Sequence, residues 1–113
     1  ISLGMLGNES SVEFLVKTLD DEEANIRWDS AISLFKMNHY TGNYILEKLL
    51  DKEYYLNYPQ VDRREIDNSI LTVLALISNS SHEEFKDELT ILKNDEKNIK
   101  IREFAMKILI ENY

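Results

Sequence analysis

The chain has 113 residues, of which 43% are apolar and 30% charged, with three Gly, one Pro and no Cys. This balance is typical of one globular domain, and the scarcity of Gly and Pro favours helices. A formal net charge of -8 opposes binding to nucleic acid, and the absence of Cys excludes disulfides and thiolate metal sites.

The first segments along the chain indicate helices in pairs. Residues 1–7, ISLGMLG, are typical of the last turns of a helix, with Gly7 as a left-handed stop. Residues 11–19 form an amphipathic segment, and an acidic turn at 20–23 leads into a second helix at 26–37. Because the chain starts with Ile in the middle of such a pair, we expect it to be a piece of a longer protein.

The second helix of this pair returns twice along the chain. Its pattern is Ile26-Arg27-x-x-Ser30-Ala31-x-Ser33-Leu34, which aligns with Ile66-Asp67-x-x-Ile70-Leu71-x-Val73-Leu74 and Ile101-Arg102-x-x-Ala105-Met106-x-Ile108-Leu109. The copies start at 26, 66 and 101, a spacing typical of helical solenoids. Shorter amphipathic segments at 42–50 and 83–92 are predicted to be the first helices of the second and third pairs.

These segments predict a single domain over residues 1–113. It comprises the end of a preceding repeat at 1–7, repeat 1 at 8–40, repeat 2 at 41–79 with an insertion at about 51–64, and repeat 3 at 80–113. We expect Ser80 or Ser81 to form a capping box with Glu83 or Glu84 at the start of the third repeat.

The segment LGNESSVEFLVKTLDDEEANIRWDSAISLFKM resembles a HEAT repeat of the phycobilisome-lyase-like type, and the resemblance extends over nearly the whole chain. It implies an all-α fold: a right-handed α-α superhelix, or HEAT-like solenoid, of about three helix-turn-helix repeats, in a bacterial protein. Such repeats occur in scaffolds, adaptors and a few enzymes, so the resemblance is specific for fold rather than function.

In the resembled family an Asp of the turn and the Arg that follows it commonly pair as a ladder between repeats. The resemblance therefore implies a structural ladder made of Asp20, Asp21, Arg27, Asp95 and Arg102. Anion binding is the alternative role for the two arginines. Asp67 stands where the middle repeat should carry Arg, and we expect Arg63 or Arg64 to supply the missing cation.

A helical wheel of the second helices separates their faces. One face, with Ile26, Ser30 and Leu34 in the first copy, is predicted to pack on the partner helix. Ala31, Leu71 and Met106 are expected to meet an adjacent repeat. A third strip is left open, with Trp28, Ile32 and Lys36 in the first copy, Asn68, Thr72 and Leu76 in the second, and Glu103, Lys107 and Glu111 in the third.

This strip is the predicted contact surface for a partner. Trp28 puts a large aromatic side chain where the other copies carry Asn68 and Glu103, and Trp is prominent among interface hot spots. The alternative is that Trp28 packs against the tyrosine-rich insertion or the neighbouring repeat. The predicted contact residues are Trp28, Ile32, Lys36, Asn68 and Thr72, with Tyr54, Tyr55 and Tyr58 of the insertion on the rim.

The sequence holds no recognisable catalytic or metal-binding set. His39 and His82 lie far apart, and no Gly-rich phosphate loop or nucleophile-His-acid set occurs. We therefore expect a non-catalytic protein- or peptide-binding module with no metal, no cofactor, no nucleic-acid partner and no membrane insertion, located in the cytoplasm. The alternatives are a lyase-like enzyme or cofactor-handling subunit, and a segment that caps a longer solenoid.

Overall fold

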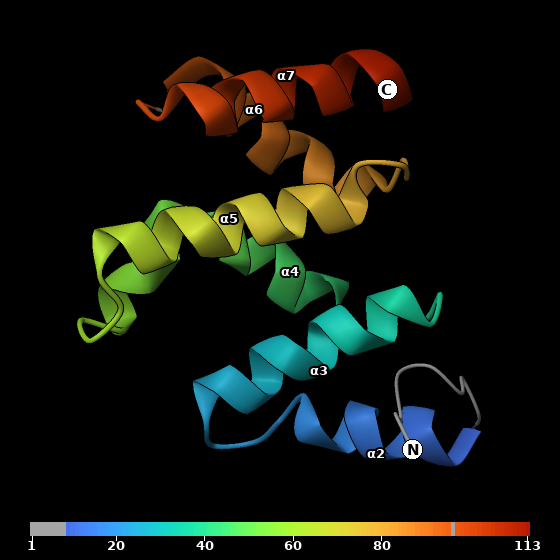
Figure 1. Cartoon of the computed structure of the whole chain (residues 1–113). Helices are drawn as coiled ribbons and strands as arrows, with labels where there is room; N and C mark the ends of the chain where they lie inside the picture. The colour runs from blue at the N-terminus through green and yellow to red at the C-terminus, as the bar shows by residue number, and fades with distance from the viewer. Residues whose placement is uncertain (1–8, 96) are drawn as a thin grey trace. The chain divides into compact units, whose positions relative to one another are not determined.

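The computed structural model describes residues 9–95 and 97–113. Within these ranges the chain forms helices and no strand, so the predicted all-α class is confirmed. In chain order the elements are α2 (Glu9–Thr18), α3 (Ala24–Lys36), α4 (Asn43–Leu49), η1 (Lys52–Asn57), α5 (Arg63–Ile77), η2 (Glu83–Phe85), α6 (Lys86–Asp95) and α7 (Ile99–Asn112) (Figure 1). Each helix predicted from the sequence corresponds to one of α2 to α7. The predicted helix end at residues 1–7 lies outside the described residues.

The chain divides into two compact units, Ile1–Leu46 and Glu47–Tyr113, with the boundary inside α4. The sequence predicted one domain over residues 1–113. In a helical repeat array each repeat contacts only its neighbours, so the repeat pattern does not decide how many cooperative units the chain contains. The single domain therefore stays a prediction.

In the first unit, α2 and α3 pack against each other. Leu15 and Leu34 are buried between them, and the hydroxyls of Thr18 and Ser30 lie 2.5 Å apart and join the two helices. Ile26, predicted to be in this core, is 42% exposed. It lies in the first turn of α3, and helical side chains point toward the N-terminus, so Ile26 extends past the packed part of the helix.

Helix α3 ends in a Schellman motif built on a residue other than glycine. Asn38 has a φ of 61°, in the left-handed region that Asn tolerates better than most residues. The His39 N–H donates to the carbonyl of Leu34 at 2.9 Å, and the Asn38 N–H donates to that of Phe35 at 3.0 Å. These bonds satisfy two of the last carbonyls of α3 and turn the chain toward α4.

The start of α4 lies very close to α3. A Cβ added to Gly42 would be 2.9 Å from the Ala31 Cα and 3.1 Å from the Leu19 Cδ2. Only glycine fits there without moving backbone atoms. Ala31, predicted to meet the next repeat, thus contacts the residue just before that repeat's first helix.

In the second unit, α7 packs against both α5 and α6 (Figure 1). Helix α5 begins with a capping box: the Asp62 carboxylate accepts from the Glu65 N–H at 2.9 Å, and the Glu65 carboxylate accepts from the Asp62 N–H at 3.2 Å. The fully buried side chains of this unit come from α5, η2, α6 and α7 and from the residue just after α4, and they include Leu50, Ile70, Leu74, Phe85, Leu89, Ile101 and Ile108.

The capping box predicted at the start of the third repeat is wrong. The helix begins with η2, whose N-cap His82 makes no side-chain capping bond. The Ser80 hydroxyl instead donates to the carbonyl of Ile77 at 3.1 Å, at the end of the preceding helix. A Ser three residues before Glu fits either arrangement, and here the last carbonyls of α5 take the hydroxyl.

Candidate protein-binding site

On α3, the predicted strip runs from a half-buried to an exposed side chain. Trp28 and Ile32 are half-buried, and Lys36, two turns after Trp28, is exposed. Phe35 lies beside the strip and is buried, with its ring edge-on to that of Tyr40 at a centroid distance of 5.1 Å. Helix α3 thus presents one half-buried indole followed by an exposed cation.

On α5, in the second unit, Asn68 and Thr72 are both exposed. The Thr72 hydroxyl donates to the Asn68 carbonyl at 2.9 Å, so it bonds within its own helix. The Asn68 amide keeps both a donor and an acceptor for a partner. The strip residues of α3 and α5 belong to different units.

The tyrosines of the insertion have two different roles. Tyr54 and Tyr58 are half-buried, their rings pack edge-on at a centroid distance of 5.3 Å, and their hydroxyls lie 3.3 Å apart. Tyr55, predicted on the rim, is only 2% exposed, and its hydroxyl donates to the carbonyl of Leu49 at 2.6 Å. Tyr55 is therefore a core residue, and its prediction as a contact residue is wrong. Tyr54 and Tyr58 remain predicted contact residues.

The environment of Tyr55 suits a neutral phenol. Burial raises its pKa far above the ordinary value, which outweighs the lowering by a hydrogen bond with Ser69. Tyr54 and Tyr55 are adjacent in the sequence, and within the 3-10 helix η1 it is Tyr55 that is buried. The sequence predicts all three tyrosines on the rim, because no signal in it predicts this short helix.

Arg27 holds the acidic turn of its own repeat. Its Nη1 donates to the carbonyl of Asp21 at 2.7 Å and to that of Glu22 at 3.1 Å. The Asp21 carboxylate accepts from the Glu23 N–H at 2.8 Å, and Asp20 is exposed. These bonds give Arg27 a structural role within the turn, and the ladder between repeats stays a prediction.

In the third repeat, the structure describes no bond between the predicted ladder residues Asp95 and Arg102. Arg102 is exposed, in contrast to half-buried Arg27, and the side chain of Asp95 lies outside the described residues. In place of an Arg, the N-cap Asn98 organises this turn. Its side-chain oxygen accepts from the N–H groups of Lys100 at 3.0 Å and Ile101 at 3.4 Å.

Asp67 joins three elements of the second unit. The Asn98 amide donates to its Oδ2 at 3.2 Å, and the Lys52 Nζ lies 3.3 Å from its Oδ1. That Oδ1 is buried and accepts no well-aligned hydrogen bond, so the contact with Lys52 is an ion pair by distance alone. Because the cation near Asp67 comes from η1, the prediction that Arg63 or Arg64 would pair with it is wrong.

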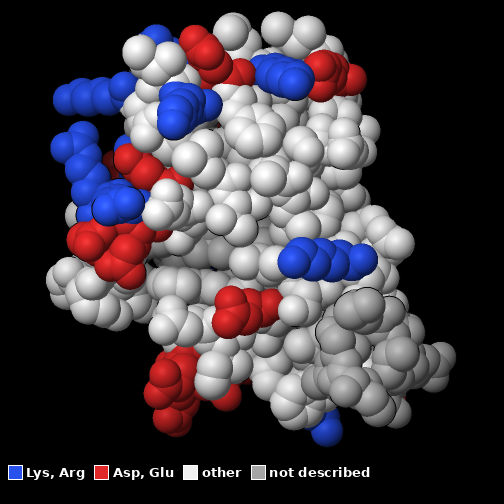
Figure 2. Space-filling model, viewed as in Figure 1, with Lys and Arg blue, Asp and Glu red and all other residues white. Residues whose placement is uncertain are grey.

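The surface charge is mixed in sign. Figure 2 shows Lys and Arg lying next to Asp and Glu on the face in view, with wide areas of uncharged side chains between them. A continuous basic surface of the kind that nucleic-acid binding needs is not seen on this face.

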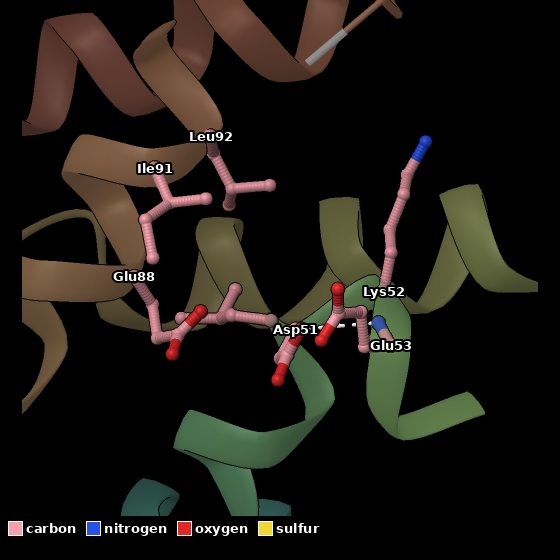
Figure 3. A pocket seen from close by; sticks show the side chains of 7 residues that line it. Asp51, Lys52, Glu53, Glu88, Ile91 and Leu92 are labelled. Carbon is pink, nitrogen blue, oxygen red and sulfur yellow. Dashed lines mark hydrogen bonds between the residues drawn. The ribbon is translucent and has the colours of Figure 1, made fainter. Parts of the chain in front are cut away.

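An open hollow of about 360 Å³ lies between the start of the insertion and α6 (Figure 3). Its lining combines three aliphatic side chains with acidic groups: Leu50, Asp51, Lys52, Glu53, Glu88, Ile91 and Leu92. Asp51 and Glu88 point toward the same space in Figure 3, while Lys52 points away from it. The Asp51 carboxylate accepts from the Glu53 N–H at 3.0 Å and so caps η1.

Electrostatics in this hollow disfavour negative charge. Burial raises the pKa of the Glu88 carboxyl, and repulsion from Asp51, Glu47 and Asp87 raises it further. Within the described part of the chain, no group of three or more His, Asp or Glu side chains is arranged to hold a metal ion. The lining includes carboxylates and one amine but no histidine or hydroxyl. Its carboxylates suit a positively charged group, and its aliphatic side chains suit an apolar chain attached to that group.

Sequence reasoning missed this hollow. Residues 50–53 follow α4 and open the insertion, whereas Glu88 and Ile91 lie on α6. The spacing of Glu88 and Ile91 places them on one face of α6, which is a visible signal. The sequence does not show that this face of α6 lies opposite residues 50–53, and only the folded structure reveals it.

Comparison with protein-family models, with curated proteins and with solved structures finds no match for this chain. None of the described helices is both long and apolar enough to cross a bilayer. The resemblance to HEAT repeats therefore rests on the residues of the sequence, and the superhelix and its function are proposals.

Proposed function

We propose that the chain is a HEAT-like superhelix that acts as a non-catalytic protein- or peptide-binding module. Three repeated second helices, each following a shorter helix, support the architecture. The observation that carries the function is the position of Trp28 on α3, where the chain's one tryptophan remains partly exposed and is followed on the same side by exposed Lys36. A partner can bury the rest of the indole there and pair with the amine.

The test compares the proteins captured by the wild-type chain with those captured by variants. We expect Trp28→Ala and Lys36→Glu to lose the same partner. Lys36→Glu is included because Lys36 is exposed, so its replacement leaves packing intact even if Trp28→Ala is less stable. Truncation of an interface tryptophan commonly weakens binding by about 2 kcal/mol or more, which removes a partner from a pull-down.

Phe14→Ala is the matched control. Phe14 is an aromatic residue of the same unit, 56% exposed on α2, and lies outside the strip. It should retain the partner that the strip variants lose. If wild type, Trp28→Ala and Lys36→Glu capture identical proteins, the strip is not the binding surface.

A further inference from the structure

A second hollow, of about 460 Å³, lies in the second unit where α5 and α7 begin. Its lining is mainly basic and amide-bearing: Arg63, Arg64, Asp67, Asn68, Leu71, Asn98 and Lys100. Figure 2 shows Lys and Arg side chains gathered on the side where these helices begin, at the left of the view, with acidic side chains beside them. We call this feature the basic hollow.

The three cations of the basic hollow take no part in the ion pairs among the described residues. Arg63, Arg64 and Lys100 are all exposed, and none of them forms an ion pair with another described residue. The one carboxylate in the lining, Asp67, is already held by Lys52 and Asn98. The lining thus presents excess positive charge on a chain whose net charge is -8.

Their positions also cost stability. Arg63 and Arg64 are the first two residues of α5, and Lys100 is the second residue of α7. The positive end of the helix dipole lies at the N-terminus, so a cation in the first turn is unfavourable there. The helix dipoles therefore do not favour these charges, so a role in binding can be separated from a role in stability by measuring both.

Recognition in the basic hollow must come from side chains. The N-terminal amides of α5 and α7 are already capped by Asp62 and Asn98. The guanidinium groups of Arg63 and Arg64 can each form forked hydrogen bonds with a carboxylate. Asn68, exposed beside them, offers both a donor and an acceptor to a peptide backbone.

We propose that the basic hollow binds a short segment of a partner protein that is rich in Asp and Glu. This inference rests on the proposed function and gives the chemistry of the partner. A peptide segment fits better than a nucleic acid, because the net charge of -8 repels an extended polyanion while a short segment interacts chiefly with the local cations.

The test measures binding of a fluorescein-labelled hexaglutamate peptide by fluorescence anisotropy, at about 20 mM salt, where charge attraction is weakly screened. In the triple variant Arg63→Gln, Arg64→Gln, Lys100→Gln we expect affinity to fall about tenfold, since three exposed charge pairs together supply roughly that factor. The same variant should melt no lower than wild type, because the removed charges oppose the helix dipoles.

The matched control replaces three other exposed lysines of the second unit, Lys86, Lys93 and Lys107, with Gln and makes the same change in net charge. It should change the affinity for hexaglutamate by less than about twofold. Equal losses in both triple variants would mean that binding follows overall charge and would overturn the proposal. So would absence of binding, or tighter binding of an oligothymidylate of the same length through the same three residues.

The two proposals fail separately. If hexaglutamate does not bind but a partner depends on Trp28 and Lys36, only the basic hollow is rejected. If hexaglutamate binds through Arg63, Arg64 and Lys100 while the strip variants capture the same proteins as wild type, only the strip is rejected.

Discussion

Single residues decide whether the insertion belongs to the core or to the surface. Tyr55 connects η1 to the end of α4, because its buried hydroxyl satisfies the carbonyl of Leu49. An unpaired buried carbonyl costs free energy that a nonpolar ring cannot recover. One phenol therefore anchors a segment whose neighbours Leu56 and Asn57 are exposed.

We predict that Tyr55→Phe lowers the free energy of unfolding by about 1 to 2 kcal/mol at pH 7, because it leaves the Leu49 carbonyl without its donor. The wild type should lose stability as pH rises above 10.0, the ordinary pKa of Tyr, since the unfolded phenol ionises there while the folded one keeps its proton. The gap between wild type and Tyr55→Phe should then narrow.

Urea unfolding at neutral and alkaline pH measures both effects. Tyr44→Phe, which changes a tyrosine that is 46% exposed, is the control and should stay close to wild type at pH 7. A gap between wild type and Tyr55→Phe that stays constant above pH 10.0 would contradict the assigned burial of the phenol.

The helices themselves follow from local sequence signals, whereas their contacts do not. Apolar spacing placed all of α2 to α7, and the predicted insertion contains η1. The partners of Asp67 and the two hollows depend on residues brought together from distant parts of the chain, such as Lys52 and Asn98. Periodicity carries no information on those pairings.

The candidate binding site could likewise be predicted only in part, because periodicity gives the exposed side of a helix but not its contacts. Exposure of Lys36, Asn68 and Thr72 agrees with the predicted strip, because a wheel identifies the side of a helix that is left open. A helical wheel does not apply to 3-10 segments, which is why the sequence predicts Tyr55 on the rim although it is buried. Two cations of the basic hollow, Arg63 and Arg64, are the partners of Asp67 that the sequence predicts, because the sequence alone does not show that Lys52 pairs with it.

At the scale of elements, the close approach of α3 to the start of α4 gives a sharp prediction. Gly42→Ala should lower the free energy of unfolding by about 1 to 3 kcal/mol, because the new methyl group would meet the Ala31 backbone. Thermal or urea unfolding followed by circular dichroism measures the loss. Thr41→Ala, at the exposed neighbouring position, should cost far less. Equal stability of Gly42→Ala and wild type would show that the two helices are farther apart.

At the scale of the whole molecule, an excess of acidic residues works against the fold where carboxylates gather. Glu88 is the clearest case, since burial and then Asp51, Glu47 and Asp87 raise its pKa. A carboxyl whose pKa is raised on folding destabilises the protein above that pKa and ceases to do so below the unfolded value of about 4.5.

We therefore predict that Glu88→Gln is more stable than wild type at pH 7, by less than about 1 kcal/mol because solvent screens this partly exposed group. The gain should decline as pH falls and disappear below 4.5, where the wild-type carboxyl is neutral in both the folded and the unfolded state. Melting temperatures across this pH range provide the measurement. Glu103→Gln, an exposed change of the same charge on α7, should show no comparable gain.

The single tryptophan has a consequence for experiments on folding. Trp28 belongs to the first unit, whereas four of the six tyrosines, Tyr54, Tyr55, Tyr58 and Tyr113, belong to the second. Indole emission therefore follows the opening of the first unit, and far-ultraviolet circular dichroism follows the helices of both. Coincident transitions from the two signals would mean that the chain unfolds as one cooperative body, and separated transitions would give each unit its own stability. The natural sequence thus carries its own optical label for one half of the molecule.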